Sequence, residues 1–316
     1  MEKIIITGGA GFIGSSVCRK LLSDKKYVIC IDNFDPNYSP DLKKRNVSPF
    51  IGKSNFKLYQ EDIRNIVGLN KIFIKENPDK IIHLAAKVGV RNSLLQPKEY
   101  EEVNVGGTLN LLELAKTFEI KQFIFGSSSS VYGNNNKVPF SEEDSANFQI
   151  SPYGVTKKAG ELLCRTYSHL FKIPITCLRF FTVYGPCGRP DMAPYLFTDS
   201  IYKKIPIKQY GDGLSKRDYT YIDDIVAGII SSLSKPYIYE IINLGGGETI
   251  SLNKFISIIE KLVGNKAKIT FLFKQPGDVN ITFANIKKAR KMLGFKPKYN
   301  IKEGMKKYIE WYLEHD

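Results

Sequence analysis

Short runs of β-branched residues alternate with helical patterns through the first half of the chain. The apolar runs are short enough for buried strands, and in the segments between them apolar residues recur every three to four positions. This alternation predicts a doubly wound parallel sheet with helices on both faces. The predicted strands are Lys3–Thr7, Tyr27–Ile31, Phe56–Tyr59, Lys80–Leu84, Gln122–Phe125 and Ile175–Phe180, and the predicted helices are Phe12–Ser23, Asn65–Glu76, about Asn104–Phe118, and Tyr153–Phe171.

After about residue 180 the pattern loosens, and Gly, Pro and Tyr interrupt it. Regular patterns return later, which indicates a smaller lobe that closes over one edge of the sheet, with some strands returning to the sheet. The later elements are expected at Ile222–Ser232, Glu240–Asn243, Asn253–Leu262 and Ile301–Tyr312.

Composition changes this picture little. The chain has 316 residues, of which 43% are hydrophobic, so it can bury a large core. The formal net charge of +14 raises the possibility of nucleic-acid binding. Lysines such as Lys306 and Lys307 lie along a predicted helix face, however, without an aromatic-basic RNA motif. We therefore expect no nucleic-acid partner, and a positive field that attracts phosphate-bearing ligands.

The sequence also suggests a compartment. No apolar run approaches the length of a membrane span, and Met1-Glu2-Lys3 leads into a strand pattern without a basic leader or cleavage site. The five cysteines are scattered and odd in number, which is typical of reduced thiols. We expect a cytoplasmic protein that has no membrane partner.

The first strand runs into a glycine-rich turn and then a helix. Gly9, Gly11 and Gly14 fit G-x-G-x-x-G, and Gly8, Gly11 and Gly14 fit G-x-x-G-x-x-G. Glycines permit the tight turn and let the backbone approach a pyrophosphate at the helix N-terminus. In this context the turn predicts a dinucleotide site.

Asp32 ends the second strand, 18 residues after Gly14. A carboxylate there accepts hydrogen bonds from ribose hydroxyls and repels a 2′-phosphate, so it favours NAD over NADP. Small residues after His83 let the cofactor lie close, and His83 itself is interpreted as structural. The expected cofactor contacts are Gly8, Gly11, Phe12, Ile13, Gly14, Asp32, Asn33, Asp62, Ile63, Leu84, Ala85 and Ala86, together with Tyr153 and Lys157.

Tyr153 and Lys157 lie one helical turn apart on one face. A phenol has a pKa of about 10, and a nearby ammonium and a positive nicotinamide ring favour the phenolate. Gln122–Phe125 leads into Gly126 and the serines Ser127–Ser130, which gather hydroxyls at a strand's carboxyl end. A hydroxyl there can bond a substrate alcohol and relay its proton to the tyrosine.

At these residues the chain resembles, over essentially its whole length, the extended short-chain dehydrogenases/reductases that modify nucleotide sugars. The matching stretches are Thr7–Gly14, His83–Ala86, Ser127–Gly133, Ser151–Lys157, Leu178–Gly185, Arg217–Tyr219 and Gln275–Asp278. The resemblance implies that Ser128, Tyr153 and Lys157 are catalytic. It further implies that Arg217 binds the pyrophosphate, Tyr210 stacks on uracil and Asp278 holds the nucleotide ribose.

Within this group the chain is most similar to UDP-glucuronate 4-epimerases, through Leu178–Pro186, Gly188–Ala193 and Gly89-Val90-Arg91. In UDP-galactose epimerases an Asn usually stands where Thr182 is. Thr182 and the hydroxyls of Ser128, Ser129 and Ser130 suit a sugar carboxylate, and Arg91 and Arg189 are candidate charge partners. Positions 129 and 130 lack the acids of related dehydratases and UDP-xylose synthases. Lys87, Cys187 and Gln275 depart from the usual Gln, Trp and Arg.

The resemblance thus implies NAD-dependent 4-epimerisation of UDP-glucuronate to UDP-galacturonate through a transient 4-keto sugar. The expected fold is a Rossmann-type doubly wound parallel sheet with a smaller mixed α/β substrate lobe. Residues 1–178 and about 219–246 would form the NAD-binding domain, and residues 179–218 and 247–316 the nucleotide-sugar lobe.

Two alternatives stay open. One is a 4-epimerase of UDP-N-acetylhexosamine or UDP-galactose, and the other is a non-catalytic NAD-binding regulator on the same fold. The resemblance and the apolar residues Leu109, Leu112, Leu162 and Leu163 also suggest a homodimer through the helices Asn104–Phe118 and Tyr153–Phe171, although these leucines fit a core equally well.

Overall fold

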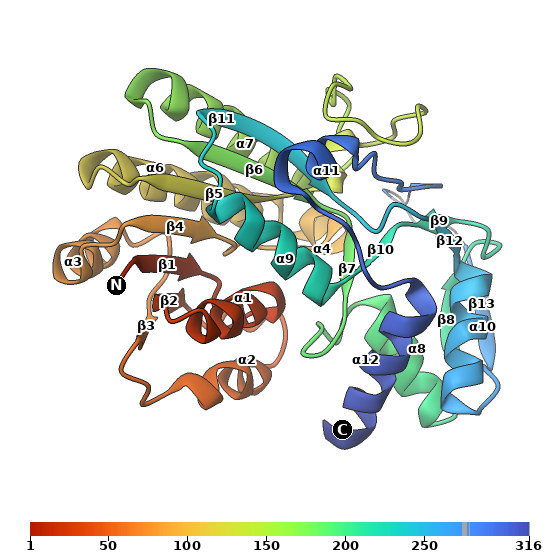
Figure 1. Cartoon of the computed structure of the whole chain (residues 1–316). Coiled ribbons are helices and arrows are strands. Elements are labelled where there is room, and N and C mark those ends of the chain that lie inside the picture. Colours follow the sequence, from red (N-terminus) through yellow and green to blue (C-terminus); the bar gives the residue numbers. More distant parts are fainter. Residues whose placement is uncertain (274–276, 278, 316) are drawn as a thin grey trace.

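A parallel sheet of seven strands forms the centre of the molecule (Figure 1). The computed structural model describes residues 1–273, 277 and 279–315. The strand order is β11-β6-β5-β4-β1-β2-β3, so the order reverses between β1 and β4. In such sheets ligands bind beyond the carboxyl ends of the strands at this reversal. The strands are β1 (Lys3–Thr7), β2 (Tyr27–Asp32), β3 (Phe56–Gln60), β4 (Lys80–His83), β5 (Gln122–Ser128), β6 (Ile175–Phe180) and β11 (Tyr239–Leu244).

The two faces of the sheet build two separate cores, because side chains alternate along each strand. On β1, Ile4 and Ile6 pack into one core, and Ile5 packs into the other. All three are fully buried, which explains why the strands read as continuous apolar runs. The first core includes residues of α1 (Phe12–Ser23) and α9 (Ile222–Leu233), and the second those of α3 (Ile66–Glu76), α6 (Gly107–Thr117) and α7 (Pro152–Phe171).

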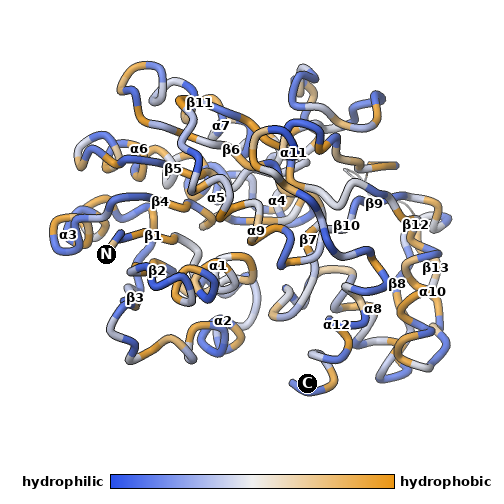
Figure 2. The backbone as a smooth tube through the Cα atoms, viewed as in Figure 1, coloured by the Kyte–Doolittle hydropathy of each residue, from blue (hydrophilic) through white to orange (hydrophobic). Residues whose placement is uncertain are grey.

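A smaller lobe lies beside the sheet, at the lower right of Figure 1. Its helices are amphipathic, and hydrophobic and hydrophilic segments alternate along α10 and α12 in Figure 2. Short two-stranded pairings join the lobe to the segments that leave the sheet. The lobe and its connections comprise β7 (Thr182–Tyr184), α8 (Ala193–Tyr202), β8 (Ile207–Tyr210), β9 (Lys216–Arg217), β10 (Tyr219–Tyr221), β12 (Ile250–Ser251), α10 (Leu252–Val263), β13 (Ile269–Leu272) and α12 (Ile301–His315).

The predicted fold class is confirmed, and a strand from the second half, β11, does return to the sheet beside β6. The structure differs mainly at element ends and in short helices that the patterns did not predict. The helix expected at about Asn104–Phe118 begins as a π-helix, η2 (Glu102–Gly106), before α6. The domain boundaries stay a prediction. The short helices not predicted are α2 (Pro40–Val47), η1 (Ser48–Phe50), α4 (Val90–Leu95), α5 (Pro97–Glu101), η3 (Ser129–Tyr132), α8 and α11 (Lys287–Leu293).

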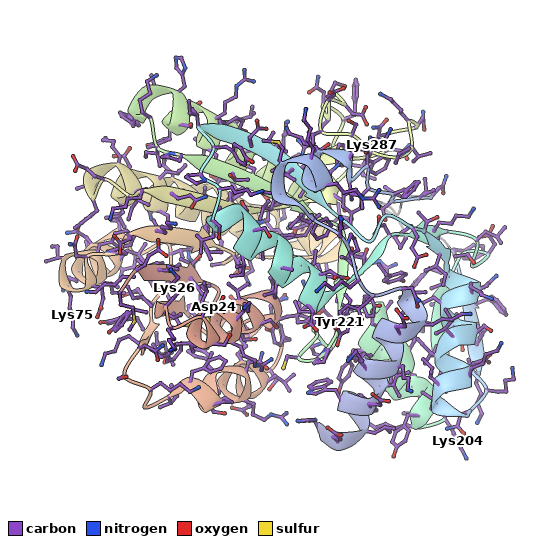
Figure 3. All side chains as sticks on the ribbon, viewed as in Figure 1. Asp24, Lys26, Lys75, Lys204, Tyr221 and Lys287 are labelled. Carbon is purple, nitrogen blue, oxygen red and sulfur yellow. The ribbon has the colours of Figure 1, made fainter. Side chains whose placement is uncertain are left out.

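The basic side chains are dispersed. Lys75, Lys204 and Lys287 are exposed and project from separate parts of the molecule, on α3, after α8 and on α11 (Figure 3). These three lysines therefore do not belong to one basic groove. Across the residues that the structure describes, no helix combines the length and the apolar character needed to cross a membrane.

Candidate active site

A cavity of about 470 Å³ opens at the carboxyl ends of the parallel strands. All twelve residues expected to contact the cofactor line it, as do Tyr153 and Lys157. So do most of the residues expected to contact the sugar nucleotide. The structure therefore brings residues from positions 8 to 217 around one space. The expected substrate residues in its lining are Ser128, Ser129, Ser130, Thr182, Arg189 and Arg217.

The glycine turn after β1 fits a dinucleotide. Gly8 has φ +67°, and a Cβ there would lie 2.7 Å from the backbone nitrogen of Ala85. A Cβ on Gly14 would collide with the carbonyl oxygen of Gly8. At Gly11 a Cβ would lie 3.1 Å from the same carbonyl oxygen, a tight contact, and 3.8 Å from the hydroxyl of Tyr38. The turn is thus closed by Gly8 and Gly14 and leaves a cradle at the N-terminus of α1 in which a pyrophosphate fits.

Asp32 lies at the end of β2 with only 6% of its surface exposed. Its carboxylate accepts hydrogen bonds from the backbone nitrogens of Ala10 (3.1 Å) and Phe34 (2.8 Å). Burial raises its pKa, while Lys43 and these two N–H groups act in the opposite direction. Two of the carboxylate's roughly four acceptor positions are used, so it retains capacity for ribose hydroxyls.

Beside it, Asn33 and Asp62 are held together. The side-chain amide of Asn33 donates to Asp62 Oδ2 at 2.9 Å, and Arg64 donates to both carboxylate oxygens of Asp62. The hydrogen bonds from Arg64 lower the pKa of Asp62 to about 2, against the effect of burial. An ionised acceptor therefore stands next to the apolar Ile63, as suits an adenine base.

Ser128 and Tyr153 reach the cavity from different elements. Ser128 is the last residue of β5, and Tyr153 stands in the first turn of α7. The Ser151 hydroxyl caps that helix by accepting a hydrogen bond from Gly154 N at 3.1 Å. Lys157, one turn further, is buried and donates from Nζ to the carbonyl oxygen of Gly126 at 2.7 Å.

The electrostatics differ from the sequence expectation. Burial raises the pKa of Tyr153, and the opposing influences are hydrogen bonding with Ser128 and the positive charge of Arg189. The pKa of Lys157 is lowered to about 8 by burial, although Cys164 and Glu161 act to raise it. Lys157 Nζ is engaged by Gly126, and Arg189 is a charge that acts to lower the pKa of Tyr153. Arg189 itself is held by both carboxylate oxygens of Asp191.

His83 is structural, as interpreted from the sequence. Its ring nitrogens contact the hydroxyls of Thr7 (2.7 Å) and Thr108 (3.0 Å). Complete burial, together with the charge of Lys157, lowers its pKa to about 3, so the ring is neutral at physiological pH. The imidazole thus connects β1, β4 and α6 through these two hydrogen bonds.

Two expected substrate residues, Arg91 and Tyr210, are not among the residues that line the cavity. The Arg91 guanidinium lies 4.2 Å from the centre of the Tyr210 ring, so α4 and the end of β8 meet there. Such a cation–π contact covers one face of the Tyr210 ring, so a stacking uracil would need the other face or a displacement of Arg91. Asp278 and Gln275 lie outside the described residues.

The sequence analysis missed several polar residues of the lining. Asp35, Tyr38 and Lys43 come from the segment after β2 and from α2, and Lys87 follows β4. The Lys43 ammonium lies 4.9 Å from the centre of the Tyr38 ring. No motif marks these positions. The one signal was that Lys87 differs from the usual Gln. Among the described residues no cluster of His, Cys, Asp and Glu side chains could hold a metal ion.

The fold and the site together define the class of extended short-chain dehydrogenases/reductases. The family model described as GDP-mannose 4,6 dehydratase matches residues 5–308, and the chain belongs to this family.

Relatives and solved structures narrow the comparison. The chain is 46% identical to UDP-glucuronate 4-epimerase of Thermodesulfobacterium geofontis (strain OPF15), covering 100% of this chain and 97% of that protein. It is similar, with 39% identity, a TM-score of 0.93 and 99% of both chains covered, to UDP-glucuronic acid 4-epimerase from Bacillus cereus in complex with UDP-glucuronic acid and NAD. UDP-glucose 4-epimerase from Thermotoga maritima with UDP-glucose shows 30% identity and a TM-score of 0.92, with 99% of both chains covered.

Proposed function

We propose that this protein is a UDP-glucuronate 4-epimerase that uses NAD. The observation that carries the proposal is the set of hydroxyls at one end of the cavity, from Ser128, Ser129, Ser130 and Thr182. These lie in the same lining as Tyr153 and Lys157, and the full-length similarity to UDP-glucuronate 4-epimerases supports the assignment.

The hydroxyl set suits a carboxylate. A carboxylate has two oxygens with about four acceptor positions and needs donors where water is excluded. Ser128 ends β5 beside Phe180 of β6, and Thr182 follows two residues later, so the hydroxyls come from neighbouring strands. Neutral donors attract the carboxylate less strongly than a cation would, and Arg189 in the same lining is already paired with Asp191, so the sugar can release and rotate.

Each of the catalytic residues has a separate role in moving or holding a proton. When bound, the nicotinamide of NAD supplies the hydride acceptor and donor for C4 of the sugar. Tyr153 takes the proton of the 4-hydroxyl, and Ser128 donates a hydrogen bond to the sugar oxygen. Arg189 favours the phenolate, and Lys157, in its protonated form, holds the end of β5 through Gly126.

Epimerisation requires that the ketone be presented to the hydride donor on its other face. The cavity lining contains no acid or base at positions 129 and 130 to remove the C5 proton and drive water elimination. Hydroxyls that hold the carboxylate at a fixed angle also oppose decarboxylation, to which a 4-keto uronic acid is prone as a β-keto acid. The expected product is therefore UDP-galacturonate alone.

Product analysis tests the function. The purified protein is incubated separately with UDP-glucuronate, UDP-glucose and UDP-N-acetylglucosamine, and the products are identified by NMR. We expect interconversion with UDP-galacturonate at the highest kcat/KM. A higher kcat/KM with either neutral sugar would contradict the proposal and favour the corresponding alternative epimerase, and no turnover of any of them would favour a regulator.

The cofactor has its own test. The buried Asp32 carboxylate, already bonded to two backbone N–H groups, would repel a 2′-phosphate, so bound NAD is expected. The cofactor is released by denaturation and identified by mass. Stoichiometric NADP in the released fraction would contradict the role of Asp32.

The proposal also includes a homodimeric assembly and a location in the cytoplasm. Leu109 on α6 and Leu162 on α7 are 39% and 54% exposed, whereas Leu112 is buried, so the leucines divide between a surface and the core. The exposed ones support a homodimer through α6 and α7. The five cysteines are free, which supports work in a reducing compartment such as the cytoplasm.

A further inference from the structure

Lys87 lies at the carboxyl end of the strand that follows the reversal of the sheet. Its backbone is fixed on both sides by the buried side chain of Asn104, which accepts from Lys87 N at 2.8 Å and donates to Lys87 O at 3.0 Å. The same amide donates to Thr156 of α7 at 3.0 Å. The direction in which the lysine side chain leaves the backbone is thus set by the core of the protein.

The Lys87 ammonium joins two acids from different segments. Nζ lies 3.1 Å from Oδ2 of Asp35 and 2.8 Å from Oε1 of Glu99 on α5. The lysine side chain is only 11% exposed. Burial acts to lower its pKa, but the two carboxylates outweigh burial and raise the pKa, so the ammonium stays charged.

Asp35 is itself well anchored on the other side. Its Oδ1 accepts from the backbone nitrogen of Asn37 at 2.9 Å, and its carbonyl oxygen accepts from Lys43 Nζ at 2.8 Å. A second contact joins the same segment to α4, from Asn92 Nδ2 to Asn37 Oδ1 at 3.4 Å. The segment after β2 and the loop after β4 are therefore linked.

The topology shows what this link spans. In the sheet, β1 lies between β4 and β2, and the glycine turn follows β1. A contact between the loop after β4 and the loop after β2 therefore bridges over the glycine turn that follows β1, where the pyrophosphate would bind. Lys87 and Asp35 line the same cavity as Gly11 and Asp32, so the link borders the cofactor's space.

We propose that Lys87 is a positioning residue that, through its ion pair with Asp35, forms a clasp over the bound dinucleotide and slows its release. The proposal rests on the proposed function in that NAD is the resident cofactor. Epimerisation oxidises and reduces the sugar with one cofactor molecule, so a dinucleotide that leaves between the two steps would strand the ketone. A clasp that keeps it bound therefore serves this reaction directly.

Cofactor exchange tests the clasp without any sugar present. The purified holoenzyme is mixed with excess isotopically labelled NAD, and the appearance of label on the protein is followed over time. Lys87→Gln and Asp35→Asn should each exchange at least tenfold faster than the unmodified protein. The asparagine keeps the acceptor for Asn37. The double variant should be no faster than the faster single variant, because both changes break the same ion pair.

Matched variants separate the clasp from a general loss of structure. Lys98→Gln removes an equal charge from a side chain on α5 that is 89% exposed, and its exchange should be unchanged. Lys87→Arg keeps the charge and should restore slow exchange. With added NAD, Lys87→Gln should regain kcat for UDP-glucuronate, which a misfolded protein would not.

Three outcomes overturn the proposal. One is exchange in Lys87→Gln that is as slow as in the unmodified protein. Another is fast exchange in Lys87→Gln with slow exchange in Asp35→Asn, which would mean that Lys87 contacts the dinucleotide directly. In both of these cases the epimerase function stands. If the unmodified protein binds no NAD at all, the proposed function fails together with the clasp.

Discussion

Tyr153 and Ser128 meet because one begins a helix and the other ends a strand. Neither position is chemically unusual by itself, and burial alone disfavours the tyrosinate. The nearby hydroxyl and the Arg189 charge oppose that effect. At the scale of the residue, the site thus depends on which polar groups share a dry space with the phenol.

Tyr153→Phe should abolish turnover and leave UDP-sugar binding nearly intact, because the ring is kept and the base is lost. General-base loss typically costs about a hundred- to ten-thousand-fold in rate. The measurement is kcat with UDP-glucuronate beside a titration of UDP binding. A variant that retains near-full rate would show that another group is the base.

Thr182→Val should lower kcat/KM for UDP-glucuronate much more than for UDP-glucose. The valine keeps the shape and removes one donor to the carboxylate, a loss of about 1–3 kcal/mol. Decarboxylated product should increase, since the carboxylate is held less firmly. Paired assays with product analysis provide the measurement, and equal losses on both substrates would refute a carboxylate-reading role.

Lys157 should make stability depend on pH in an unusual direction. Its pKa is about 8 in the folded protein, below the ordinary 10.5. Between these values the unfolded chain binds more protons, so the free energy of unfolding rises with pH by roughly 3 kcal/mol from this group. Below pH 8 the buried lysine is charged and lowers the free energy of unfolding by the full amount. As the pH rises toward 10.5 the buried lysine loses its proton, and this destabilisation disappears.

This prediction is measured by urea unfolding of the unmodified protein and of Lys157→Met at about pH 7 and pH 10.5. On going from pH 7 to pH 10.5, the free energy of unfolding of the unmodified protein should rise relative to that of Lys157→Met. Lys98→Met, which alters an exposed lysine, serves as the control. A difference that is independent of pH would mean that Lys157 titrates as an ordinary lysine.

At the scale of the element, a buried ionic network holds α7 against β5 and β6. Glu161 accepts from Ser127 Oγ at 2.7 Å and from both Nε and Nη2 of Arg179 at 2.8 Å. The Glu161 and Arg179 side chains are each 1% exposed. Since Glu161 lies two turns after Tyr153 on α7 and Ser127 precedes Ser128 on β5, the network fixes the elements that carry the catalytic side chains.

Arg179→Met should destabilise the protein by about 3–5 kcal/mol, because the buried Glu161 carboxylate loses both hydrogen bonds from the guanidinium and keeps only Lys158, at 3.4 Å, as a charge partner. Arg179→Met combined with Glu161→Gln should be less destabilised than Arg179→Met alone. Both are measured by urea unfolding. The comparison is Lys20→Met, which breaks an exposed ion pair with Asp24 and should cost less than about 1 kcal/mol. Equal losses in the free energy of unfolding for Arg179→Met and Lys20→Met would show that the buried ion pair stabilises the protein no more than an exposed one.

At the scale of the whole molecule, the sheet supplies the cofactor side of the cavity and the segments that leave it supply the rest. Thr182, Arg189 and Arg217 all follow β6 in the chain, and they line the same cavity as the glycine turn after β1. Bound substrate would therefore touch both parts.

The homodimer prediction belongs to this scale. Leu109→Arg combined with Leu162→Arg places two charges on the exposed α6 and α7 face and should convert a dimer into a monomer. Leu313→Arg, on α12 and 51% exposed, should leave the dimer intact. Sedimentation velocity at micromolar concentration distinguishes the two states. A monomeric unmodified protein would refute the prediction.

The order of elements and the cofactor half of the cavity were predictable from the sequence, because both depend on local patterns. Buried strands appear as apolar runs, and the glycine turn must follow the first strand at close spacing. The helices α2 and α8 were not predicted, since each has a Pro in its first turn and a Pro also marks turns and loops. The same holds for Lys43, which lies on α2.

What the sequence by itself determined is the type of fold and which residues can do chemistry at the ends of its strands. Only the tertiary structure decided how those residues are charged and paired. Burial, not the neighbouring lysine, dominates the pKa of Tyr153; Arg91 stacks on Tyr210; and Lys87 pairs with Asp35, which is 52 residues away in the chain. The physical reason is that solvation and charge pairing depend on distances in space, which residue spacing along one strand or helix does not encode.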